Sequence, residues 1–161
     1  MFETTFKHNE TDACHDKTIT LHDCIADRVC FSDNILRFYL PDGFWVTPLH
    51  EDNNLDKTVR TDAAVVDFRL DGIDSIYLCV FTQNFFKKTR VEAWEMRDLM
   101  REINSGKCSI EFIYQYRTHF EQMWLCEIRA NKKPYFRECQ LHLPETEATF
   151  RWNNLRPDRE W

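Results

Sequence analysis

The chain has 161 residues, a length that fits one globular domain, 1–161. Of these residues 43% are hydrophobic and 30% are charged, a composition that excludes a disordered chain. Its formal net charge of −6 disfavours binding to nucleic acid, because an acidic surface repels phosphate groups. No apolar run reaches the roughly 18 residues of a membrane span, and the first ten residues lack a signal-peptide core, so we expect a cytoplasmic protein.

Short strands separated by marked turns are predicted for the start of the chain. Residues 1–17 are polar, and we expect them to be loosely ordered. Residues 18–31 predict one or two strands, and residues 35–40 predict the returning strand. The turns are Ser32-Asp33-Asn34 and Pro41-Asp42-Gly43, because Asn, Asp and Gly accept a left-handed backbone and Pro presets φ.

A loop and a further pair of strands follow. Residues 44–46 predict a further short extended segment, and the polar stretch 48–62 predicts a loop exposed to solvent. Residues 63–70 and 76–81 are predicted to pair as a hairpin around Asp71-Gly72.

One amphipathic helix is predicted over about residues 89–104. Thr89 and Glu92 have the spacing of a capping box, in which each side chain bonds a free backbone amide of the first turn. An apolar stripe then runs at helical intervals toward Ile103, and Gly106 is placed to end the helix in a left-handed conformation.

Three regular alternations between Lys107 and Leu143 predict an antiparallel meander. In the first, one apolar face is expected to hold Cys108, Ile110, Phe112, Tyr114 and Tyr116. A short strand over 148–152 and a polar tail complete the chain. The expected fold is therefore α+β and β-rich: a bent antiparallel meander or partly open barrel of about seven to nine strands, with the 89–104 helix packed against it.

Three apolar residues interrupt the polar face of that meander. They are Ile113, Leu125 and Phe136, about one in each strand. If the strands pair in order, these side chains form a row, and an exposed apolar row requires a cover. We expect the helix to cover it; the alternative is that the row is a binding patch.

The seven cysteines show no C-x-x-C spacing, and we expect them to be reduced and mostly buried. The cluster Cys14-His15 and His22-Asp23-Cys24 offers a weak alternative as a metal site, in which His22 and Cys24 project together while the adjacent Asp23 points away. A nucleophile–base pair of Cys24 with His22, or of Cys139 with His142, is a further alternative. Neither pair lies where a thiolate is stabilised, so we expect no catalytic residue and no cofactor.

Charge is distributed unevenly along the chain. Residues 1–88 contain 15 acidic and 9 basic side chains, whereas residues 89–161 contain 12 of each. An acidic first half suits a protein partner with a basic surface. In size and acidity the chain is similar to immunity-type inhibitors, so the first functional hypothesis is a non-enzymatic protein-binding module that occludes such a partner.

The residues expected to carry this binding are two tryptophans and an acidic loop. Trp45 and Trp152 would anchor the partner unless they pack in the core, since Trp is enriched in interface hot spots. Glu51, Asp52 and Asp56 would steer the association.

The second hypothesis is a protein that binds a small apolar ligand inside the bent sheet. The residues expected to line its cavity are aromatic: Phe38, Phe112, Tyr114, Tyr116 and Trp124. An enzyme or metalloprotein centred on His22-Asp23-Cys24 is the third hypothesis. The sequence indicates no particular oligomeric state.

Overall fold

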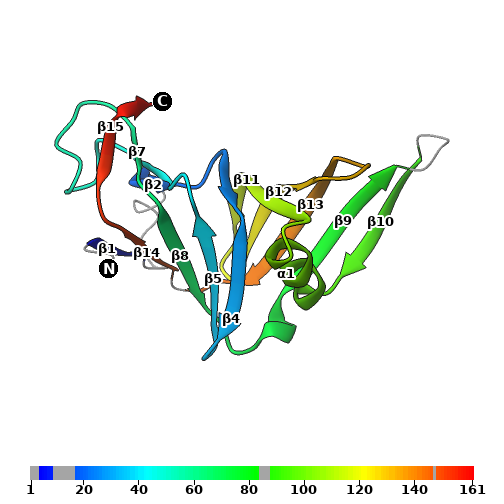
Figure 1. The fold of residues 1–161 in the computed structure, drawn as a ribbon. Helices are drawn as coiled ribbons and strands as arrows, with labels where there is room; N and C mark the ends of the chain where they lie inside the picture. Colours follow the sequence, from blue (N-terminus) through cyan, green and yellow to red (C-terminus); the bar gives the residue numbers. More distant parts are fainter. Residues whose placement is uncertain (1–3, 9–16, 84–87, 147) are drawn as a thin grey trace.

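The computed structural model describes residues 4–8, 17–83, 88–146 and 148–161. Within these residues the chain forms strands β1–β15, one α-helix, α1, and a short 3-10 helix, η2 (Figure 1). This confirms a β-rich α+β fold. The strands belong to three antiparallel sheets, and none of the described sheets closes into a barrel. Cys14 and His15, from the possible metal cluster, lie outside the described residues, as does most of the 1–17 segment.

A five-stranded sheet forms one side of the molecule. In spatial order its strands are β1 (Thr4–His8), β14 (Ala148–Trp152), β8 (Ala64–Arg69), β5 (Ile35–Leu40) and β4 (Arg28–Ser32). The hairpin between β4 and β5 turns through Asp33 and Asn34, whose φ angles of 52° and 61° are both left-handed. A two-residue loop of this kind suits the twist of the adjoining strands, and the predicted turn is confirmed.

A six-stranded sheet forms the other side. In spatial order its strands are β10 (Thr89–Trp94), β9 (Tyr77–Gln83), β13 (Phe136–Pro144), β12 (Glu121–Ala130), β11 (Cys108–Arg117) and β3 (Cys24–Ala26). The meander β11–β12–β13 is confirmed. The hairpin predicted around Asp71-Gly72 is wrong, because β8 lies in the five-stranded sheet and β9 in this one. Helix η2 (Ile73–Ser75) follows Gly72 and carries the chain from one sheet to the other.

The third sheet is small and lies at the end of the molecule that carries the C-terminus (Figure 1). In spatial order its strands are β15 (Leu155–Glu160), β7 (Val59–Thr61), β6 (Trp45–Val46) and β2 (Ile19–Thr20). The segment predicted as a polar tail is thus a strand. Gly43, in the predicted turn before β6, has a φ of 72°, and a Cβ there would lie only 2.1 Å from Thr61 Oγ1. That turn is confirmed, and it requires glycine because of this close approach.

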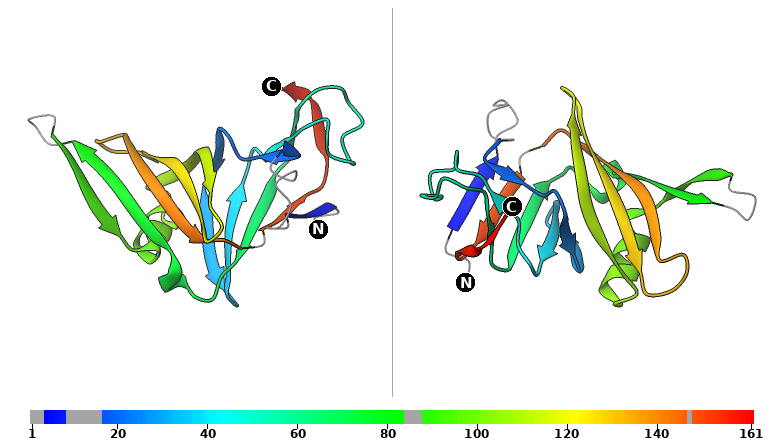
Figure 2. Two further views of the ribbon diagram at one scale, coloured as in Figure 1. Left: turned by 180° about the vertical axis from the view of Figure 1, so that it is seen from behind. Right: turned by 90° about the horizontal axis from the view of Figure 1, so that it is seen from above.

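The five- and six-stranded sheets face each other across one hydrophobic core (Figure 2). Phe38 on β5 and Phe112 on β11 meet edge to face, with ring centroids 5.2 Å apart. Helix α1 contacts both β4 and β11 and therefore closes one end of the space between the sheets.

The predicted helix begins seven residues too early. Helix α1 spans Met96–Asn104, whereas Thr89–Trp94 forms β10, so the proposed capping box of Thr89 and Glu92 does not exist. The β-branched residues Thr89 and Val91 favour an extended backbone, and pairing with β9 satisfies that backbone. The later part of the predicted stripe is confirmed, since Met96, Leu99 and Ile103 are buried.

The predicted end of the helix is confirmed. Gly106 has a φ of 71°, its amide donates to Ile103 O at 2.8 Å, and the Lys107 amide donates to Glu102 O at 3.1 Å. This bonding is a Schellman motif, which satisfies the last carbonyls of the helix. No helix in the described part of the chain is long and apolar enough to cross a bilayer.

The apolar row expected across the meander does not form. Ile113 is the extra residue of a β-bulge in β11. Leu125 pairs with Gln140, whereas Phe136 pairs with Arg129 farther along β12, so their side chains are not neighbours. Helix α1 covers the core face of the sheet, and Phe136 remains 62% exposed. The expected cover by the helix was therefore wrong.

Candidate functional site

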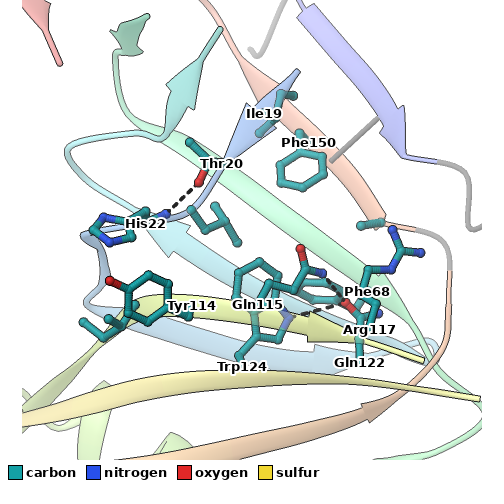
Figure 3. Close-up of a pocket in the computed structure, with 13 residues that line it drawn as sticks. Ile19, Thr20, His22, Phe68, Tyr114, Gln115, Arg117, Gln122, Trp124 and Phe150 are labelled. Carbon is teal, nitrogen blue, oxygen red and sulfur yellow. Dashed lines mark hydrogen bonds between the residues drawn. The ribbon is translucent and has the colours of Figure 1, made fainter. Parts of the chain in front are cut away.

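A cavity of about 460 Å³ lies between the two large sheets, at the end of β11 farther from α1. Figure 3 shows the residues that line it. We call it the inter-sheet cavity. Its apolar walls come mainly from β2, β8, β14 and the segment after β2: Ile19, Leu21, Phe68, Ala148 and Phe150. Its polar lining comes mainly from β11 and β12: Tyr114, Gln115, Arg117 and Gln122, with Thr20 and His22 on the opposite side. Such a volume falls in the range of small-molecule sites, about 300–1,000 Å³.

The bulge at Ile113 explains why polar side chains face inward here. Before it, Ile110 and Phe112 point into the core, as the regular alternation predicts. After it, Gln115 pairs with Trp124 and Arg117 pairs with Gln122, so that these four side chains share the inner face. One extra residue in a strand exchanges the faces of all residues that follow it.

An amide cluster forms part of the cavity wall. The Oε1 atom of Gln122, a residue only 2% exposed, accepts hydrogen bonds from Gln115 Nε2 at 3.2 Å and from Trp124 Nε1 at 3.4 Å (Figure 3). Within the described chain, neither Gln122 Nε2 nor Gln115 Oε1 makes a hydrogen bond. The cluster therefore retains one donor and one acceptor group.

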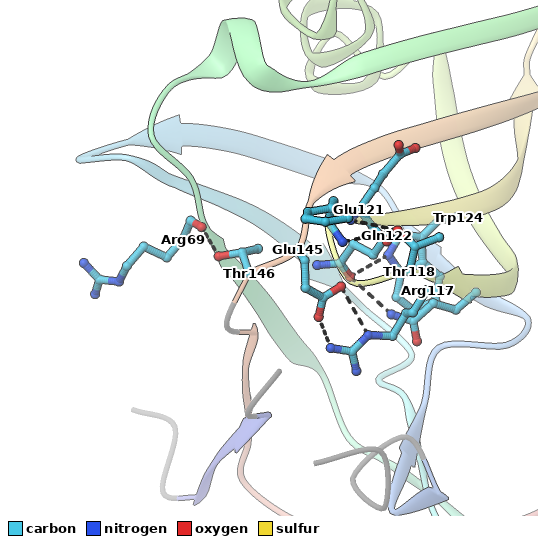
Figure 4. A network of polar contacts seen from close by, with 10 residues as sticks. Arg69, Arg117, Thr118, Glu121, Gln122, Trp124, Glu145 and Thr146 are labelled. Carbon is cyan, nitrogen blue, oxygen red and sulfur yellow. Dashed lines mark hydrogen bonds and ion pairs between the residues drawn. The ribbon is translucent and has the colours of Figure 1, made fainter. Parts of the chain in front are cut away.

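A buried ion pair lies next to these amides. Arg117 Nη2 and Nε contact the two carboxylate oxygens of Glu145, and the two side chains are only 16% and 9% exposed (Figure 4). The Glu145 amide donates to Phe120 O at 3.0 Å, which fixes the segment after β13 beside the β11–β12 turn. Glu145 therefore offsets the charge of Arg117 at this point of the cavity wall.

His22 and Tyr114 border the end of the cavity away from Arg117 (Figure 3). Their rings meet edge to face with centroids 5.2 Å apart. Asp23 has a φ of 56°, and this left-handed backbone brings its Oδ2 within 3.0 Å of His22 Nδ1, although the two atoms are not aligned for a hydrogen bond. The expectation that Asp23 points away from His22 was wrong, because these residues form a turn between β2 and β3 and not a strand.

The cysteine and metal alternatives find no support in this geometry. Cys24 is fully buried, and its burial raises the pKa of the thiol to about 12, so it remains protonated and unreactive. Cys139 is buried opposite Cys126, whereas His142 contacts Glu121. Among the described residues, no group of three or more His, Cys, Asp or Glu side chains is arranged to hold a metal ion.

Of the five residues expected to line a ligand cavity, the structure brings two to it. Tyr114 and Trp124 line the inter-sheet cavity. Phe38 and Phe112 belong instead to the packed core. Tyr116 lies beyond the bulge and points outward, with 55% of its surface exposed.

The two expected partner anchors are both engaged within the protein. Trp152 is 1% exposed, and its ring centroid lies 5.3 Å from that of Phe44, so the alternative that it packs in the core is confirmed and its role as a partner anchor is wrong. Trp45 is half-buried. Its Nε1 donates to His22 O at 3.0 Å, and the guanidinium carbon of Arg60 lies 4.8 Å from the centre of its ring.

The loop predicted over 48–62 is confirmed only in part: Val59–Thr61 forms β7, and the acidic side chains before it are exposed. Glu51, Asp52 and Asp56 all lie on the surface between β6 and β7. The loop is ordered from within by Asn53, which is 5% exposed and whose Nδ2 donates to Val46 O and Lys57 O, each at 3.0 Å. The acidic side chains are therefore held on a fixed framework.

Sequence reasoning missed most of the polar lining of the cavity. The alternation assigns Gln115 and Arg117 to the outer face, and Glu145 lies 28 positions from its partner. The available signal was the polar residue Gln122 at an inward position of β12, two places before Trp124. No family model, curated protein or solved structure matches the chain.

Proposed function

We propose that the chain is a binding protein for a small uncharged ligand with hydroxyl or amide groups, and that the inter-sheet cavity is its site. The observation that carries this proposal is the convergence of unused polar atoms of Gln115 and Gln122 on a cavity of about 460 Å³ with aromatic walls. A few polar groups in an otherwise apolar pocket are typical of small-molecule sites.

Charge supports an uncharged ligand over an ionic one. Arg117 is the cation nearest the amide cluster, and Glu145 already neutralises it in a two-point contact. A ligand carboxylate would compete with Glu145 for Arg117, and a Glu145 that lost its partner would be an uncompensated buried charge, which is strongly unfavourable. Hydroxyl and amide groups instead match the Gln122 donor and the Gln115 acceptor.

The test is a binding screen of uncharged fragments that carry hydroxyl or amide groups, monitored by NMR. Binding should shift the Trp124 indole N–H and the Gln122 side-chain amide resonances. Ala148→Leu, which fills the cavity, should abolish binding, and the matched control Ala93→Leu on the exposed face of β10 should retain it. Fragments that bind equally well to the Ala148→Leu variant would contradict the proposal.

A second candidate function is recognition of a basic protein surface by the acidic loop, with an inhibitor-like occlusion of that partner. The observation that favours it is the ordered framework around Asn53, beside which Leu49 is 68% exposed. Acidic side chains held in place, next to an apolar contact, lower the entropy cost of association.

This candidate predicts a salt-dependent association with basic proteins. The triple variant Glu51→Gln, Asp52→Asn, Asp56→Asn should slow association several-fold at low salt, because electrostatic steering acts on the on-rate. Asp71→Asn with Asp74→Asn, near η2, is the control and should change little. An on-rate that does not respond to salt would contradict this function.

A further inference from the structure

A second pocket, of about 320 Å³, lies at the C-terminal end of α1. It shares no residue with the inter-sheet cavity. Its walls come from the β10 end, the α1–β11 turn and the β12–β13 loop, and its apolar surface comprises Trp94, Cys108, Ile128 and Ala130. We call it the basic pocket, because Lys107, Lys132, Lys133 and Arg137 line it against the single carboxylate of Glu102.

Arg137 provides the main evidence that this pocket binds a ligand. It pairs with Ile128 in the neighbouring strand, so its side chain shares the inner face of the six-stranded sheet. The guanidinium carbon lies 5.5 Å from the centre of the Trp94 ring. The Nε atom is buried and has no hydrogen-bond partner within the described chain. Buried donors are almost always satisfied, so this N–H lacks an acceptor that a bound group would supply.

The charges around Arg137 favour an anion. Lys107 Nζ contacts Glu102 at 3.0 Å, and these two charges neutralise each other. Lys132 and Lys133 are exposed on the β12–β13 loop and make no ion pair within the described residues. Three uncompensated cations thus surround one pocket in a chain whose net charge is −6. Such a local concentration attracts anions despite the overall charge.

We propose that the basic pocket binds a small organic anion, whose carboxylate or phosphate group contacts Arg137, Lys132 and Lys133 and whose apolar body lies against Ile128 and Trp94. A guanidinium offers paired N–H donors in a fork that matches two oxygens of such a group. The apolar floor requires a body of hydrocarbon, so an aryl or acyl anion fits better than an inorganic ion.

The test uses four probes of similar size or charge: phenyl phosphate, benzoate, inorganic phosphate and benzyl alcohol. Calorimetric titration should detect binding of phenyl phosphate or benzoate. The probe with the higher affinity shows whether the pocket prefers a phosphate or a carboxylate group. Inorganic phosphate should bind at least ten-fold more weakly, and benzyl alcohol should not bind. In NMR spectra the Arg137 Nε–H resonance should shift on binding, while that of Arg159, which pairs with Asp42, should not.

Variants then assign the contacts. Arg137→Gln should weaken binding ten-fold or more, Arg137→Lys should restore part of the affinity, and Lys132→Gln or Lys133→Gln should each weaken it about three-fold. Arg159→Gln is the matched control and should have no effect. Absence of binding by both organic anions, equal binding of benzyl alcohol, or an unshifted Arg137 Nε–H in the saturated wild-type protein would each overturn the proposal, even if Arg137→Gln failed to fold.

Discussion

The two ends of the space between the five- and six-stranded sheets are filled in opposite ways. At one end, Leu99 and Ile103 of α1 close a fully apolar core. At the other, Gln122 and the Arg117–Glu145 pair border a cavity. The same strands, β11 and β12, contribute to both ends, and the bulge at Ile113 separates them. A single extra residue therefore lets one sheet serve as core at one end and as a polar site at the other.

The largest expected effect comes from breaking the charged pair at the cavity end. Arg117→Met leaves Glu145 buried without its partner and should lower the free energy of unfolding by about 3–5 kcal/mol, because an uncompensated buried charge is costly. Urea denaturation measures this loss. The double variant Arg117→Met, Glu145→Leu should recover much of it, since the buried charge is then gone. Losses that simply add in the double variant would show that the two side chains act independently.

Truncation of one isoleucine at each end compares the packing directly. Ile103 is 1% exposed in the core, and Ile103→Ala should cost about 2–4 kcal/mol, because it leaves a void in dense packing. Ile113 is half-buried and already borders the cavity, so Ile113→Ala should cost only about 1 kcal/mol. Equal losses in thermal or urea denaturation would mean that the cavity end is packed as tightly as the core.

A second buried ion pair separates the effect of burial from that of the cavity. Asp67 on β8 accepts two hydrogen bonds from Arg37, each 2.6 Å long, and contacts Arg151. Burial by itself raises the pKa of Asp67, but the hydrogen bonds of Arg37 and Arg151 outweigh it and hold the pKa below its usual value. Asp67→Asn should cost about 2 kcal/mol at pH 7.

The pH dependence of that loss has a defined sign. Because the folded pKa of Asp67 is lowered, its contribution is fully present above the unfolded value of about 3.9 and disappears as the pH falls through the folded value. The stabilities of wild type and Asp67→Asn should therefore begin to converge below about pH 4 and come together only below the folded pKa of Asp67. The exposed control Asp71→Asn should follow the wild type throughout, and a gap that persists in acid would contradict this assignment.

The sequence predicted the apolar end of the molecule well and the polar end poorly, for a physical reason. The alternation in residues 35–40 and the glycine at 106 depend on local rules, and the structure confirms both. The apolar residues of Thr89–Trp94 fit the spacing of a helix and of a strand equally well, and pairing with β9 makes the segment a strand. No local sequence pattern marks the bulge at Ile113, because the inward position of Gln115 and Arg117 depends on partners that are distant in the sequence. Glu145, the partner of Arg117, comes from the segment that follows β13, a strand two places away from β11 in the sheet.

The smallest expected effect comes from adding volume at each end. Ala148 lines the cavity and Ala26 lies fully buried in β3, where it faces Ile110 across the strand pair. Ala26→Leu should destabilise the protein by about 1–3 kcal/mol, because the added methyl groups have no room in a dense core. Ala148→Leu should change the stability by less than about 1 kcal/mol, because its side chain extends into empty space and buries apolar surface there. Calorimetric melting of the two variants under identical conditions measures the difference. A large loss at Ala148 would show that the bulge and the amide cluster depend on an open cavity, which would make the space itself part of the architecture and not a gap in its packing.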